Sequence, residues 1–76
     1  MSQLLLNSAI AELANLQPQE TFLVKDLFKG YEWNRLDISV RRTLGTLFLN
    51  AVRSNPSLNI TVLNKTSSNQ QKYVKN

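Results

Sequence analysis

The chain has 76 residues and a formal net charge of +4, and 42% of its residues are hydrophobic. This length and composition suit one small folded domain. The absence of cysteine and histidine excludes disulfides, thiolate zinc sites, cysteine nucleophiles and imidazole bases. No apolar run approaches the roughly 20 residues of a membrane span, and the first residues lack the features of a signal peptide. We therefore expect one cytoplasmic domain over residues 1–76, with residues 1–2 and 75–76 frayed.

Charge is distributed unevenly along the chain. Residues 1–40 carry three basic and five acidic side chains, whereas residues 41–76 carry six basic side chains and no acidic one. A half of the chain that carries only positive charges suggests a polyanionic partner, most often nucleic acid. The alternative is a charge that only keeps the chain soluble.

The first half of the chain predicts two helices and a short strand. Residues 3–16 have the apolar spacing of an amphipathic helix, which Gln17-Pro18 ends because the residue before a proline avoids the α region. Residues 20–23 can start as an extended segment. Residues 24–29 suit a short helix that Gly30 stops, followed by a connecting turn over residues 31–36.

The third predicted helix runs from about Ile38 to Ser54, with Asp37 or Ser39 as its cap and Asn55-Pro56 as its end. Its apolar arc covers roughly 200° of the helical wheel, which predicts a central helix packed on two sides. The apolar arc consists of Ile38, Val40, Leu44, Gly45, Leu47, Phe48, Leu49, Ala51 and Val52.

After Pro56 the apolar period changes from 3.6 to 2, because Leu58, Ile60 and Val62 alternate with polar residues. A strand, a polar turn over residues 64–69 and a second strand over residues 70–75 follow from this pattern. The predicted fold is mainly α with a small β-hairpin. Its element order is that of a winged helix-turn-helix, with three helices, a short strand and a two-stranded wing.

The residue inventory argues against an enzyme. The five carboxylates are scattered, the two glycines stand apart, and no serine has a histidine to activate it. We therefore expect no catalytic residue, no metal site and no cofactor.

The candidate DNA-binding surface is the polar arc of the third helix together with the wing. Arginine binds phosphates or guanine edges through paired hydrogen bonds, and small polar side chains allow close approach to the ligand. The alternatives are an ordinary solvated face and, for the lysines, protection of an edge strand from aggregation. The candidate residues are Ser39, Arg42, Thr43, Thr46, Asn50, Arg53, Lys65 and Lys72.

Three further residues have either a structural or a nucleic-acid-binding interpretation, and a fourth has a structural one only. Arg41 lies within the apolar arc, so it either snorkels or pairs with a carboxylate, or else it contacts a phosphate. Trp33 and Tyr73 either cover the core or stack on unpaired bases. Gly45 is expected at a close-packing position, since glycine is unfavourable inside a helix.

Several of these segments resemble a known family. The pieces are Val24–Phe28, Trp33 and the run from Arg41 through Arg42 and Gly45 to Phe48, within a similarity that spans about residues 8–75. The family consists of small proteins of Gram-positive phages and staphylococcal cassette chromosome elements, long catalogued as a domain of unknown function. The resemblance implies a winged helix that binds single-stranded DNA beside replication proteins of the element.

The sequence thus predicts a non-catalytic protein that binds single-stranded DNA through its third helix and wing, in replication or maintenance of a mobile element. A duplex-binding transcriptional regulator and a subunit that docks on an acidic protein partner are the alternatives. Fold alone does not separate these functions. Both a monomer and a homodimer remain open.

Overall fold

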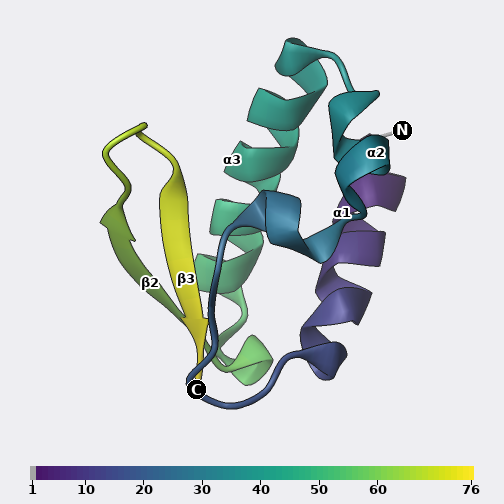
Figure 1. Cartoon of the computed structure of the whole chain (residues 1–76). Coiled ribbons are helices and arrows are strands. Elements are labelled where there is room, and N and C mark those ends of the chain that lie inside the picture. Colours follow the sequence, from purple (N-terminus) through teal and green to yellow (C-terminus); the bar gives the residue numbers. More distant parts are fainter. Residues whose placement is uncertain (1) are drawn as a thin grey trace.

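The computed structural model describes residues 2–76, which form three α-helices and a small three-stranded antiparallel sheet (Figure 1). The prediction of a mainly helical chain with a small hairpin is confirmed, and β1 adds a third strand in the order β1-β3-β2. No helix within residues 2–76 is long and apolar enough to cross a membrane. The elements are α1 (Ser2–Glu12), β1 (Thr21–Phe22), α2 (Gly30–Asn34), α3 (Ile38–Ser54), β2 (Ile60–Lys65) and β3 (Gln71–Lys75), with short 3₁₀ turns η1 (Leu13–Asn15), η2 (Val24–Leu27) and η3 (Pro56–Leu58).

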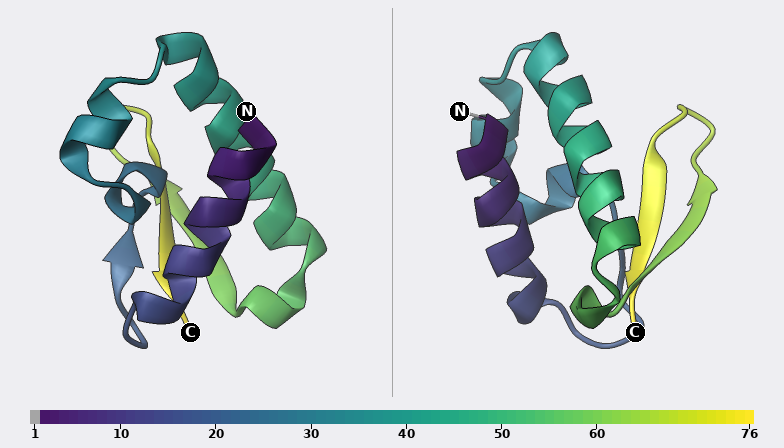
Figure 2. Two further views of the ribbon diagram at one scale, coloured as in Figure 1. Left: turned by 90° about the vertical axis from the view of Figure 1, so that its right-hand side faces the viewer. Right: turned by 180° about the vertical axis from the view of Figure 1, so that it is seen from behind.

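Helix α3 lies between α1 on one side and the β2–β3 hairpin on the other (Figures 1 and 2). The predicted bounds of α3 and its central position are confirmed. Asp37 occupies the N-cap position, although its side chain makes no capping hydrogen bond. Leu44 and Phe48 of α3 are fully buried and therefore form the centre of the core.

Three aromatic side chains tie the sheet to α3. Tyr73 of β3 stacks on Phe22 of β1 at 5.6 Å between ring centroids and meets Phe48 edge-to-face at 5.0 Å. Such pairs stabilise a fold beyond the apolar area that they bury. The buried core as a whole consists of Leu6, Ala9, Leu13, Phe22, Val24, Leu27, Leu44, Phe48, Val52 and Tyr73.

The prediction that Gly30 stops a helix over residues 24–29 is wrong, because Gly30 begins α2 instead. Two carboxylates explain the difference. Asp26 accepts a hydrogen bond from the Leu23 backbone N–H at 2.9 Å, and Glu32 accepts one from the Lys29 backbone N–H at 3.1 Å. Each carboxylate satisfies a free N–H at the start of its own short turn, so the segment divides into η2 and α2.

The predicted fraying is not found at the C-terminal end. Lys75 pairs in β3, and its ammonium donates to the carbonyls of Leu13 and Leu16 at 2.7 and 2.9 Å. Asn76 donates its backbone N–H to the Asn59 carbonyl. At the other end, Met1 lies outside the described residues and Ser2 begins α1.

Candidate nucleic-acid interface

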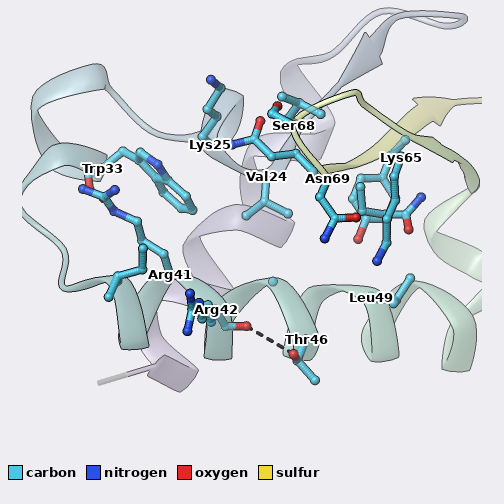
Figure 3. A pocket seen from close by; sticks show the side chains of 16 residues that line it. Val24, Lys25, Trp33, Arg41, Arg42, Thr46, Leu49, Lys65, Ser68 and Asn69 are labelled. Carbon is cyan, nitrogen blue, oxygen red and sulfur yellow. Dashed lines mark hydrogen bonds between the residues drawn. The ribbon is translucent and has the colours of Figure 1, made fainter.

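A groove of about 590 Å³ lies between α3 and the β2–β3 hairpin, and Val24 and Lys25 of η2 and Trp33 of α2 also line it (Figure 3). Ile38, Gly45 and Leu49 form part of its lining on α3, so this flank of the wide apolar arc faces the groove. The tip of the hairpin contributes amide and hydroxyl groups from residues 68–71. Four lining residues are basic and none is acidic. The basic residues are Lys25, Arg41, Arg42 and Lys65.

The structure brings only part of the predicted interface together. Of the eight predicted contact residues, Arg42, Thr46 and Lys65 line the groove. Both aromatic candidates, Trp33 and Tyr73, are also among its lining residues. The predicted residues that lie outside the groove are Ser39, Thr43, Asn50, Arg53 and Lys72.

Three of these outlying residues share the outer face of α3. At 100° per residue, Ser39, Thr43 and Asn50 lie on one strip of α3. This strip points in a different direction around the helix axis from Arg42. All three are exposed. The Thr43 hydroxyl donates to the Ser39 carbonyl at 2.9 Å, so it is occupied within its own helix. Ser39, Thr43 and Asn50 thus form a neutral strip, which Arg42 and Arg53 border on one side of the helical wheel.

Lys65 reaches the groove because of an irregularity in the hairpin. Val62 pairs with Tyr73 and Lys65 pairs with Gln71, so β2 has one extra residue between the two pairs. Strict alternation from Val62 would place Lys65 on the opposite face of the sheet. The extra residue turns Lys65 to the side of Tyr73, which faces α3. The side-chain amide of Gln71 donates to the Leu63 carbonyl within this bulge.

Lys72 and Arg53 have other surroundings. Lys72 neighbours Tyr73 on β3, so it lies on the face of the sheet that points away from α3. Arg53 lies in the last turn of α3, where a positive charge complements the negative end of the helix dipole. Neither residue is brought to the groove together with Arg42.

Arg41 is held by carbonyls of α2 rather than by a carboxylate, so the ion pair, one of its predicted interpretations, is wrong. Its guanidinium donates to the carbonyls of Trp33 and Asn34, both at 3.2 Å, and lies 5.6 Å from the centroid of the Trp33 ring. These carbonyls belong to the end of α2, where the helix offers no N–H of its own. Figure 3 shows the side chain extending from α3 toward Trp33. Arg41 therefore joins α2 to α3 at one end of the groove.

We expect Arg41→Ala to lower the free energy of unfolding by about 1–3 kcal/mol, because two carbonyls lose a charged donor. Arg42→Ala is the matched control. Arg42 is exposed, and an exposed side chain usually changes stability by less than about 0.5 kcal/mol. Urea unfolding of both variants checks the prediction, and equal midpoints would show that Arg41 has no structural role.

Trp33 is half-buried and lies among protein groups. Its ring centroid lies 5.9 Å from that of Phe28, with the two rings tilted by 31°. The Arg41 guanidinium lies over the same indole. Trp33 thus covers the core, as one of its two predicted roles requires, and it also borders the groove.

Tyr73 is only 1% exposed, which makes the predicted base-stacking role wrong. Burial raises the pKa of its phenol to about 12, and the nearby charge of Arg53 acts in the opposite direction. In the unfolded chain the phenol ionises near 10. The phenol of Tyr73 therefore binds its proton more tightly in the folded state than in the unfolded state. The free energy of unfolding that this difference contributes is fully present below about pH 10 and is lost as the pH rises to about 12.

The Tyr31→Phe variant leaves Tyr73 as the sole tyrosine and tests this shift. We expect its tyrosinate absorbance to rise with a midpoint near 12 in native buffer, and near 10 in concentrated urea. Tyr31 is 53% exposed, so its replacement should leave the fold intact. A native midpoint near 10 would show that Tyr73 is open to solvent.

Acidic side chains gather on another part of the molecule. A second cleft, formed by α1, η2 and α2, includes Glu12, Asp26 and Glu32. Asp26 and Glu32 accept the backbone hydrogen bonds described above, and Glu12 accepts one from the Asn15 side chain at 3.3 Å. No three carboxylates within residues 2–76 form a cluster that could hold a metal ion. Lys29 is the one basic residue among those that line the cleft, so the net charge of the cleft is negative and that of the groove is positive.

Sequence reasoning missed several groove residues. Lys25 was not predicted because it lies in the half of the chain that has a net negative charge. The hairpin tip was not predicted because its composition is that of an ordinary polar turn. The tip has a defined form, because Asn69 adopts a positive φ of 68° and donates its N–H to the Thr66 carbonyl at 2.9 Å. Figure 3 shows the side chains of Asn69 and Lys65 extending toward α3. An asparagine after a polar run is a signal for such a turn, but not for the direction of its side chain.

Comparison with known proteins gives a family and no function. No curated protein and no solved structure matches the chain. A family model described as a domain of unknown function, DUF1413, matches residues 7–75. This match covers α2, α3, the whole sheet and every residue that lines the groove. The chain therefore belongs to the DUF1413 family.

Proposed function

We propose that this chain is a winged helix-turn-helix protein that binds single-stranded DNA, without catalysis, in the groove between α3 and the hairpin. The order of its helices and strands and the sheet order β1-β3-β2 support the winged-helix assignment. The resemblance to small proteins of Gram-positive mobile elements supports a role in replication or maintenance of such an element.

The observation that carries the proposal is the composition of the groove. Four cations and no carboxylate line it, although the chain as a whole has five acidic residues. Phosphates supply most of the affinity of nucleic acids for such a surface. The groove also has an apolar part and several amide groups, which suit bases that are not paired with a second strand.

The outer face of α3 favours the single strand over a duplex. A helix-turn-helix protein reads duplex DNA by inserting the exposed face of this helix into the major groove. Here that face presents Ser39, Thr43 and Asn50, and the cations lie to its side. A duplex-binding regulator remains the second candidate because α3 is long enough to enter a major groove.

A competition titration tests the proposal, with single-stranded and duplex oligonucleotides of equal length at about 50 and 200 mM salt. If Lys25, Arg42 and Lys65 each neutralise one phosphate, the logarithm of affinity for oligo-dT falls with a slope of about −2. This slope corresponds to about 20-fold weaker binding over that salt range.

Tight, sequence-dependent duplex binding without affinity for oligo-dT would replace the proposal with the regulator. Equal competition by polyglutamate would instead favour an acidic protein partner.

A further inference from the structure

Gly45 is a glycine that the fold itself does not need. It lies in the interior of α3, where glycine is less favourable than alanine. Its φ is not positive, so the backbone conformation does not require it. A Cβ atom built on Gly45 would meet nothing within 4 Å, which corrects the prediction of close packing. Within residues 2–76, therefore, no neighbouring group accounts for the missing side chain.

The open space beside Gly45 belongs to the groove. Gly45 is one of its lining residues, as are Arg42 and Leu49, one turn before and one turn after it on α3. Asn69, Gln70 and Gln71 line the same groove from the hairpin. An apolar surface thus meets a row of amide donors and acceptors. A nucleobase combines a flat apolar face with a hydrogen-bonding edge, so it matches both parts.

We propose that Gly45 is a base-binding position, at which one unpaired base of a single strand lies against the bare backbone of α3. The edge of the base faces the amides of the hairpin tip, and the adjoining phosphates face Arg42 and Lys65. This inference rests on the proposed function, because it specifies what enters the groove. A side chain at position 45 would occupy the space that the base needs.

The test compares Gly45→Ala and Gly45→Leu with the parent chain. Both substitutions introduce good helix formers, so the melting temperature should rise, by about 2–8 °C for alanine. Affinity for oligo-dT should nevertheless fall, by about 5-fold to 150-fold for leucine, the range expected when one base contact is lost. Thr43→Leu is the matched control, since it raises helix propensity on the outer face of α3 and should leave affinity unchanged.

A strand of abasic deoxyribose-phosphate separates base contacts from phosphate contacts. The parent chain and Gly45→Leu should bind this probe equally, because both retain the groove cations. Unchanged oligo-dT affinity in Gly45→Leu would overturn the base-binding position while leaving the groove as the binding site. A lower melting temperature for Gly45→Ala would also overturn it, because packing would then explain the glycine. Failure of the parent chain to bind oligo-dT would instead overturn the proposed function.

Discussion

Replacing Arg42 and Lys65 together by glutamate should abolish most of the affinity for single-stranded DNA. The two residues line the groove from α3 and from β2, and both are exposed. Each neutralised phosphate contributes about eightfold to affinity at 50 mM salt, so the loss of two contacts gives about 60-fold. Repulsion by the new carboxylates should raise the total loss above about 100-fold.

The matched control is the double variant Lys29→Glu and Lys72→Glu. It has the same net charge as Arg42→Glu with Lys65→Glu, but neither of its sites lines the groove. Salt screens distant charges over about 10 Å at 0.1 M, so we expect its affinity to stay within about threefold of the parent. Fluorescence anisotropy of labelled oligo-dT measures both variants. An equal loss in the two would show that only net charge matters.

The largest expected effect on stability comes from Phe48→Ala. The Phe48 side chain is fully buried and meets Tyr73 edge-to-face at 5.0 Å and Phe22 at 6.3 Å. Removing such a side chain costs about 3–5 kcal/mol. A chain of this length is stable by only about 4–11 kcal/mol, so the variant should be close to unfolding.

Thermal unfolding followed by circular dichroism should show a melting temperature at least about 12 °C below that of the parent. Asn50→Ala on the exposed face of the same helix serves as the control and should change stability by less than about 0.5 kcal/mol. A Phe48→Ala variant that melts within a few degrees of the parent would contradict the arrangement of the core around α3.

The bounds of α3 could be predicted because local signals agree there. Its apolar spacing continues without interruption from Asp37 to Asn55-Pro56. The segment before it has conflicting signals, since a glycine that commonly ends helices is followed by an acidic residue that can begin one. In the structure the Glu32 carboxylate accepts the Lys29 N–H, and α2 begins at Gly30.

The groove could be predicted only in part, because its two sides come from distant segments. A helical wheel identifies the polar arc of α3 but not the side on which the hairpin lies. It therefore groups Ser39, Thr43 and Asn50 with Arg42, although only Arg42 lines the groove. Lys65 illustrates a second reason, since the bulge in β2 changes the face on which it lies.

The sequence allows two interpretations of Tyr73, because the register of β3 against β2 is not evident from it. Val62 is an expected inward residue, and it pairs with Tyr73. This pairing places the phenol ring in the core next to Phe48. A strand's inward face thus follows from its partner strand once the register is known.

The most direct test of binding in the groove is an NMR titration of the isotope-labelled chain with unlabelled oligo-dT at low salt. If the strand binds in the groove, the largest amide shift changes should occur along it, at Gly45, Thr46 and Asn69, and the indole N–H of Trp33 should shift with them. Changes confined to the outer face of α3, at Ser39, Thr43 and Asn50, would contradict binding in the groove and would place the nucleic acid on the surface that a duplex reader uses.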